Sequence, residues 1–183
     1  MTTFRMDLVL SEQLVPPSAR DGEADDINDA DDVSIILAHV CARADEDGCA
    51  RFVVGGFGTT AWPVDVRTDL LTVLTQLPSI VAAVVEELAE FRLDFYEQGL
   101  ERYLAFVLAE DEYRVHCTSG TQWRPEPEIV SVPVGEVVDM LLQLRDNFLA
   151  LAAAICPRSS RHALFLEWKR TVALTAHARS TIL

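Results

Sequence analysis

The sequence predicts an α+β fold, in which an antiparallel sheet of about five to six strands packs on one face against amphipathic helices as a two-layer sandwich. Two patterns predict this class. Apolar residues alternate with other residues through much of 91–117, which is the period of a half-buried strand. They recur every three or four residues through 134–155, which is the period of an amphipathic helix. Because 183 residues is a typical length for one domain, we expect a single domain over residues 1–183.

The N-terminal region is expected to hold one strand followed by an acidic loop. Residues 4–10 alternate in the manner of a strand, and Pro16-Pro17 prevents that strand from continuing. Residues 21–32 (DGEADDINDADD) hold seven carboxylates and no basic residue. Such a segment repels itself and has little apolar surface to bury, so we expect a mobile acidic loop at 18–32.

A β-hairpin is the preferred interpretation of residues 33–57. Two segments rich in β-formers flank ADEDG, and Asp47-Gly48 is a strong hairpin-turn signal. A helix over the first arm is the alternative. Its apolar face would consist of Val33, Ile36, Leu37, Val40 and Cys41.

Helical spacing returns between residues 62 and 88, with Thr68 as the expected N-cap. Pro78 removes an internal hydrogen bond and clashes with the carbonyl group four residues earlier. We therefore expect two short helices that meet near Leu77-Pro78, with one kinked helix as the alternative.

A three-stranded meander is expected over residues 91–95, 104–108 and 113–117, with turns at 97–99 and 110–112. One face of this meander should pack on helices, and the other should be polar. The proline-containing segment 121–133 is expected to be a loop. A helix over 134–155 that stops before Pro157, and a last helix over about 159–178 capped by Ser159 or Ser160, complete the fold.

Charge limits the partners of this chain. Its 29 acidic residues exceed its 15 basic residues and give a net charge of −14, which argues against nucleic acid and anionic lipid as partners. The sequence shows neither a secretory signal nor an apolar run of the roughly 20 residues that a membrane span needs. We therefore expect a cytoplasmic protein that binds a basic protein partner, and a homodimer is compatible with the sequence.

No motif in the sequence identifies a reaction. The hydrolase patterns GxSxG and HExxH are absent, and so is the GK[ST] ending of a phosphate-binding loop. The cysteines lack the spacing of a metal knuckle, so we expect buried thiols. We accordingly predict no catalytic residue, no metal site and no cofactor. The four cysteines are Cys41, Cys49, Cys117 and Cys156.

The candidate partner-binding residues are carboxylates of the meander and its turns, together with three aromatic residues. Acidic groups of this kind accelerate association with a cationic partner, and aromatic side chains commonly anchor interfaces. Trp62 and Trp123 lie in irregular segments beside prolines, where they either cover the edge of the core or anchor an interface. The predicted set is Asp94, Tyr96, Glu97, Glu101, Glu110, Asp111, Trp62 and Trp123.

The size, the acidity and the meander FRLDFYEQGLERYLAF…EYRVHC flanked by helices resemble the bacterial immunity proteins that neutralise polymorphic or contact-delivered toxins. The resemblance covers residues 33–178. It implies direct binding of a toxin domain, often a basic nuclease, in which acidic groups take the place of the nucleic-acid backbone.

Two other functions remain open. One is an acidic secretion chaperone that dimerises and wraps an extended segment of its client. The other is a small-molecule-binding or enzymatic pocket between the sheet and the helix at 134–155, for which Arg102, His116 or Glu101 would have to face inward.

Overall fold

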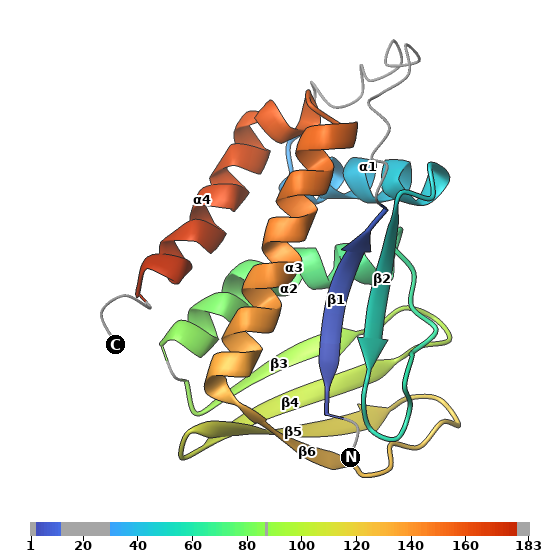
Figure 1. Cartoon of the computed structure of the whole chain (residues 1–183), viewed down its shortest axis with the longest axis vertical. Helices are drawn as coiled ribbons and strands as arrows, with labels where there is room; N and C mark the ends of the chain where they lie inside the picture. The colour runs from blue at the N-terminus through green and yellow to red at the C-terminus, as the bar shows by residue number, and fades with distance from the viewer. Residues whose placement is uncertain (1–2, 12–29, 87, 179–183) are drawn as a thin grey trace.

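Residues 3–11, 30–86 and 88–178 are described by a computed structural model. Within these residues the chain forms an antiparallel hairpin, a four-stranded antiparallel meander and helices packed against both, so the predicted α+β class is confirmed (Figure 1). The strands are β1 (Arg5–Leu10), β2 (Ala50–Gly55), β3 (Glu90–Phe95), β4 (Arg102–Ala109), β5 (Glu112–Ser119) and β6 (Ile129–Pro133). The helices are α1 (Val33–Glu46), α2 (Asp69–Val85), α3 (Val134–Ile155), the short 3-10 helix η2 (Ser159–Arg161) and α4 (Ala163–Ala178).

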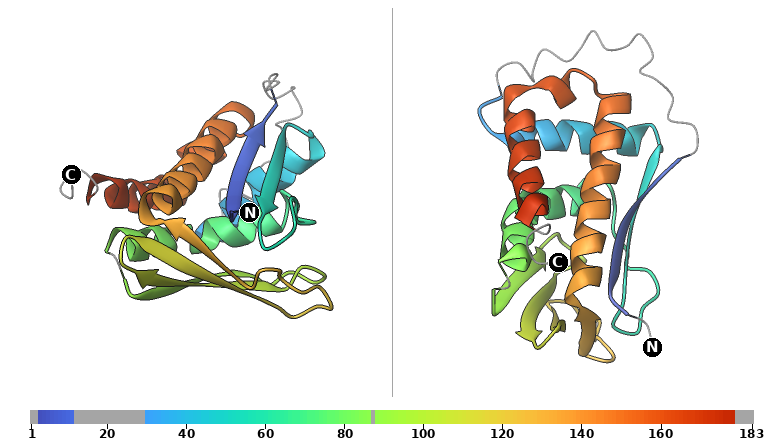
Figure 2. Two further views of the ribbon diagram at one scale, coloured as in Figure 1. Left: turned by 60° about the horizontal axis from the view of Figure 1, so that its bottom comes forward. Right: turned by 60° about the vertical axis from the view of Figure 1, so that its left-hand side comes forward.

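The strands form two separate sheets. β1 pairs antiparallel with β2, from Arg5 opposite Gly55 to Leu10 opposite Ala50, while β3, β4, β5 and β6 follow one another in the second sheet. Figure 2 shows the helices on one side of the four-stranded sheet. α2 packs on β3, α3 packs on β1, and α4 packs on α2 and α1. The other face of the four-stranded sheet is not covered by any described element.

The hairpin predicted over residues 33–57 is wrong, and the helical alternative for its first arm is confirmed as α1. The buried residues of this helix are Ile36, Leu37, Val40, Cys41 and Ala44, which recur with helical spacing. Asp32 caps the helix, because its Oδ1 accepts the N–H of Ser34 at 2.6 Å. Hydrogen bonding from the side chain and the backbone of Ser34 lowers the pKa of Asp32. Asp47-Gly48 therefore joins a helix to β2, and the strand partner of β2 is the distant β1.

The predicted acidic loop at 18–32 falls mostly outside the described residues. Positions 18–29 belong to the part that the structure does not describe, whereas 30–32 lead directly into α1.

The segment 121–133, predicted as a loop, contains the additional strand β6. It pairs antiparallel with β5 at the edge of the sheet and buries Val132 against the core. Pro133 is tolerated because it ends an edge strand, where its missing N–H interrupts no central ladder.

One continuous helix, α2, replaces the two short helices predicted around Pro78. Proline has no N–H, so the carbonyl group of Leu74, four residues earlier, lacks its helical donor. Nε1 of Trp168 in α4 donates a hydrogen bond to that carbonyl oxygen at 3.2 Å. The packing of α4 thus supplies a hydrogen-bond donor to the Leu74 carbonyl. Because this carbonyl is satisfied, α2 continues past Pro78.

The C-terminal helix begins later than predicted. Ser159 starts η2, and α4 begins at Ala163. Nδ1 of His162 accepts the N–H of Leu164 at 3.3 Å, so a histidine occupies the place predicted for a serine cap. The end of α3 at Ile155, before Pro157, is as expected.

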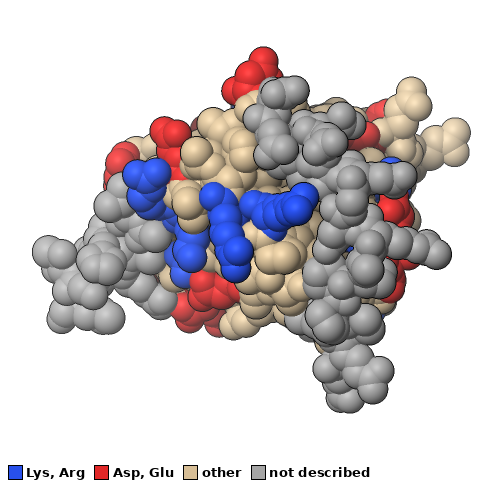
Figure 3. All heavy atoms as spheres, turned by 90° about the horizontal axis from the view of Figure 1, so that it is seen from above, with Lys and Arg blue, Asp and Glu red and all other residues tan. Residues whose placement is uncertain are grey.

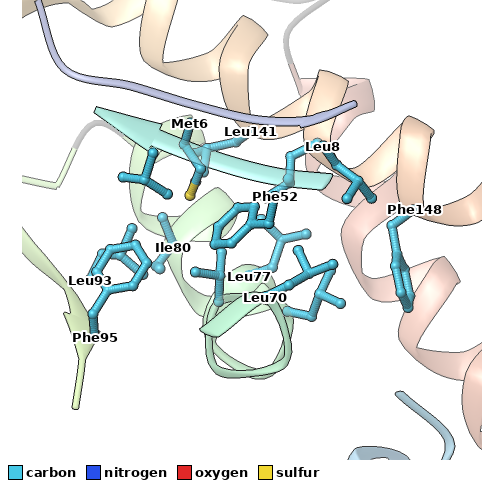
Figure 4. Close-up of a cluster of buried hydrophobic side chains, with 14 of the residues drawn as sticks. Met6, Leu8, Phe52, Leu70, Leu77, Ile80, Leu93, Phe95, Leu141 and Phe148 are labelled. Atoms are coloured by element: carbon cyan, nitrogen blue, oxygen red, sulfur yellow. The ribbon is translucent and has the colours of Figure 1, made fainter. Parts of the chain in front are cut away.

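The core lies between the β1–β2 pair, the helix-covered face of the four-stranded sheet and the helices (Figure 4). The side chains labelled in the figure come from five elements. They include Met6 and Leu8 of β1, Phe52 of β2, Leu70, Leu77 and Ile80 of α2, Leu93 and Phe95 of β3, and Leu141 and Phe148 of α3.

Candidate functional site

Asp65 and Asp69 lie at the start of α2, and the charge of Glu97 in the β3–β4 connection acts on Asp69. Asp69 is only 3% exposed; its Oδ2 accepts the N–H of Asp65 at 2.9 Å, and its Oδ1 has no hydrogen-bond partner among the described residues. Burial raises the pKa of Asp69 to about 6, and the negative charges of Asp65 and Glu97 act in the same direction. Part of the chain's negative charge is therefore held close together at this position.

The sequence around residue 65 explains how α2 begins there. Oδ1 of Asp65 accepts the backbone N–H of Thr68 at 2.6 Å and its hydroxyl at 3.0 Å. Thr68 occupies the predicted N-cap position but makes no side-chain cap of its own. Instead, the Asp65 carboxylate accepts the N–H of Thr68, and the Asp69 carboxylate accepts the N–H of Asp65. This reciprocal pair of hydrogen bonds resembles a capping box.

Further carboxylates extend this region towards α1. Asp45 and Glu46, at the end of α1, lie 3.9 Å and 3.5 Å from Nη1 of Arg67. All three side chains are exposed, so these ion pairs contribute little to stability and remain available to solvent. We call the group formed by Asp45, Glu46, Asp65, Asp69 and Glu97 the acidic end.

Some of the predicted partner-binding residues lie beside the acidic end. Tyr96, Glu97 and Glu101 belong to the β3–β4 connection, and the Tyr96 ring is 56% exposed. Asp94, on β3, is half-buried, and its backbone N–H and C=O are both bound by the side-chain amide of Gln76.

The other predicted carboxylates are far from this group. Glu110 and Asp111 form the β4–β5 turn, at the opposite end of the eight-residue strand β4. A strand of this length separates the two ends by about 23 Å. The predicted set is therefore split between two ends of the sheet.

The two candidate tryptophans line the inside of the molecule. Trp62 is 4% exposed and contacts the rings of Phe4, Phe57 and Phe95, which favours its core-covering role over that of an exposed anchor. Trp123 is half-buried, and its ring centroid lies 6.0 Å from that of Trp62.

Arg102 packs against both tryptophan rings. Its Cζ lies 4.3 Å from the Trp62 centroid and 3.7 Å from the Trp123 centroid. The side chain faces inward, as one of the two alternative functions requires, whereas His116 alternates with the buried residues of β5 and lies on its outer face. Arg102 shares its alternation phase with the buried residues Leu104 and Phe106 of β4, so the sequence already held a signal for its burial.

Two observations bear on nucleophilic and metal chemistry in the described residues. Burial raises the pKa of Cys41 and of Cys117 to about 12, so both thiols stay protonated and weakly nucleophilic near neutral pH. No group of three or more His, Cys, Asp or Glu side chains in the described part of the chain is arranged to hold a metal ion.

Positive charge gathers at a different place on the surface. The face seen from above shows several Lys and Arg side chains close together, with acidic residues around them (Figure 3). The exposed basic residues of the η2 and α4 segment are Arg158, Arg161, Lys169 and Arg170. The two signs of charge are thus partly segregated, although the chain as a whole is strongly acidic.

Comparisons with protein-family models, with curated proteins and with solved structures found no match. Among the described helices, none has both the length and the apolar character that crossing a membrane requires.

Proposed function

We propose that this chain is a non-enzymatic protein-binding module that neutralises a basic toxin domain by direct contact, in the manner of bacterial immunity proteins. The acidic end, with Tyr96 beside it, is the proposed contact surface. The observation that carries this proposal is the negative charge gathered here: Asp65 and Glu97 both act to raise the pKa of Asp69, and the exposed carboxylates of Asp45 and Glu46 approach Arg67, two residues from Asp65 and Asp69.

The electrostatics of the acidic end favour a cationic partner. Like charges that raise the pKa of a buried carboxyl group destabilise its ionised form. A lysine or arginine that a partner places beside the exposed carboxylates Asp45, Glu46 and Asp65 would offset the repulsion among these groups, and this would favour binding. The net charge of −14 would also steer a basic partner towards the chain.

Tyr96 supplies a group of a second kind. Aromatic residues are enriched among those that dominate binding energy, and this ring is the most exposed large apolar side chain in the described residues. Its place next to Glu97 puts an apolar contact and a charge within one short segment. Such a combination gives both affinity and an enhanced association rate.

Capture of the partner and a salt titration test the proposal. The tagged chain should form a one-to-one complex with a basic protein, and the association rate should fall as salt rises. Glu97→Arg should weaken binding by about tenfold or more and flatten the salt dependence, because it places a positive charge against the partner.

Asp111→Arg is the matched control, since it makes the same change of charge at an exposed turn at the far end of β4. It should leave affinity within about twofold of the unmodified chain. Equal losses in both variants would show that only net charge matters, and unchanged binding by Glu97→Arg would reject the acidic end as the contact surface.

A further inference from the structure

Arg102 is a buried cation without a counter-ion in the described residues. It is 5% exposed, and its Nε and Nη1 are enclosed without a hydrogen-bond partner. Although the chain has 29 acidic residues, none in the described part forms an ion pair with this guanidinium. Burial accordingly lowers the pKa of Arg102, yet arginine keeps its charge in proteins.

The two tryptophans form a rigid corner around this cation. Their ring planes meet at 62°, and the guanidinium carbon lies over both rings. Each indole is fixed by its own hydrogen bond to the β2–α2 connection: Nε1 of Trp62 donates to the carbonyl of Gly56 at 3.3 Å, and Nε1 of Trp123 donates to Oγ1 of Thr59 at 3.2 Å. The corner is therefore held in place by contacts that do not involve Arg102.

Stacking satisfies only part of what a guanidinium requires. The ring faces attract its positive charge, but its N–H groups point outward in its own plane and need acceptor oxygens there. A buried charged donor that lacks an acceptor is costly. The geometry therefore favours an acceptor supplied from outside the described residues, at the edge of the guanidinium.

Hydroxyl groups lie on the same side of the sheet. Ser119 is directly opposite Arg102 in the β4–β5 register, so the two side chains share one face. Oγ of Ser119 lies 3.0 Å from Oγ1 of Thr121. A guanidinium group with hydroxyl groups near it is a set of donors that can hold an oxyanion.

We propose that the corner formed by Trp62, Arg102 and Trp123 is a binding site for a small oxyanion, either a carboxylate or a phosphoryl group. The oxyanion would accept hydrogen bonds on the Nη2 side of the Arg102 guanidinium, the side that is not enclosed, beside the half-buried Trp123 ring. A planar carboxylate matches this edge with two parallel bonds, and a phosphoryl group offers the same spacing of oxygens. The site is distinct from the acidic end and does not depend on the function proposed above.

Tryptophan fluorescence of the full-length chain tests the site directly, because two of the three tryptophans form it. The chain is titrated separately with sodium acetate and with inorganic phosphate, at ionic strength kept constant with sodium chloride. We expect a saturable change in emission and a rise in Tm with at least one of the two probes. The probe that binds identifies the source of the oxyanion as a carboxylate or as a phosphoryl group.

Two substitutions of Arg102 and one control separate a specific site from general attraction. Arg102→Met should weaken probe binding by about tenfold or more, and so should Arg102→Lys, which keeps the charge but loses the fork. If Arg102→Met does not fold, Arg102→Lys alone provides the test. Arg92→Met, which removes an exposed arginine from β3, should bind as the unmodified chain does.

The proposal is overturned if neither probe produces a response beyond that of sodium chloride. It is also overturned if Arg92→Met loses as much affinity as Arg102→Lys, because the response would then reflect overall charge rather than the corner.

Discussion

At the scale of single residues, Asp69 combines burial with like-charged neighbours. Its carboxyl group accepts one backbone N–H, which favours the ionised form, but burial outweighs that bond. The pKa is therefore raised from 3.8 to about 6, and the folded chain binds this proton more tightly than the unfolded chain does. The stabilisation from the bound proton is complete below pH 3.8 and is lost as pH rises through about 6.

Asp69→Asn should stabilise the fold near neutral pH. The amide keeps an acceptor oxygen for the Asp65 N–H and removes the buried charge. We expect a gain of about 1–3 kcal/mol at pH 7, from a pKa shift of about two units at 1.36 kcal/mol each. Urea denaturation at several pH values measures it. The free energy of unfolding of the original chain should fall between pH 4 and pH 7 relative to the variant; parallel pH profiles would contradict this account.

The residue scale also shows what sequence patterns can and cannot predict about the site. The alternation of β4 places Arg102 in phase with buried residues, so its burial was available from the sequence. The effect of the Glu97 charge on Asp69 was not, because the two residues belong to different elements and are brought into range only by the packing of α2 on β3. The same holds for the tryptophan corner, which joins segments far apart in the chain.

At the scale of elements, α2 depends on a hydrogen bond from another helix. Pro78 has no N–H to donate to the carbonyl of Leu74, and the indole N–H of Trp168 in α4 donates to that carbonyl instead. This bond links residues 94 positions apart, so local rules for proline predicted a break that tertiary packing prevents. Local patterns succeeded for α3 and for the first three strands of the meander, where one alternation or one apolar face dominates.

A double-mutant cycle tests this link. Trp168→Phe should destabilise the chain by about 1–3 kcal/mol, since it removes the donor and leaves a buried carbonyl without a partner. In a Pro78→Ala background the backbone N–H gained by that substitution can bond to Leu74, so Trp168→Phe should cost about 1 kcal/mol less. Chemical denaturation of the four proteins gives the coupling energy. Equal costs in the two backgrounds would mean that the indole contributes only by packing.

Gln76 protects the edge of β3. Its side-chain amide donates to the Asp94 carbonyl at 2.9 Å and accepts the Asp94 N–H at 3.0 Å, as a neighbouring strand would. Gln76→Ala should therefore lower the free energy of unfolding by about 1–3 kcal/mol and increase self-association through the uncovered edge.

Ser79→Ala provides the comparison for this substitution. The Ser79 hydroxyl is exposed, and within the described part of the chain it bonds only to the carbonyl of Gln76 in the same helix. Its loss should change stability by less than about 0.5 kcal/mol. Denaturation together with light scattering distinguishes the two variants, and a Gln76→Ala protein as stable and monomeric as Ser79→Ala would show that the edge needs no such cover.

At the scale of the whole molecule, negative and positive side chains gather on different parts of the surface. The acidic end lies at the start of α2 and the β3–β4 connection, whereas basic side chains gather on the face seen from above (Figure 3). Composition predicted the sign of the net charge but not this separation, because charges become neighbours only when the elements pack. In the function proposed above, a basic partner would approach the acidic end.

The measurement that tests the proposed function most directly is growth rescue. The basic protein captured in the one-to-one complex is expressed alone, with the unmodified chain, and with the Glu97→Arg or Asp111→Arg variant at equal abundance. The captured protein should stop growth when expressed alone, and the unmodified chain and Asp111→Arg should restore growth while Glu97→Arg does not. A captured protein that is harmless alone, or full rescue by Glu97→Arg, would contradict neutralisation through the acidic end.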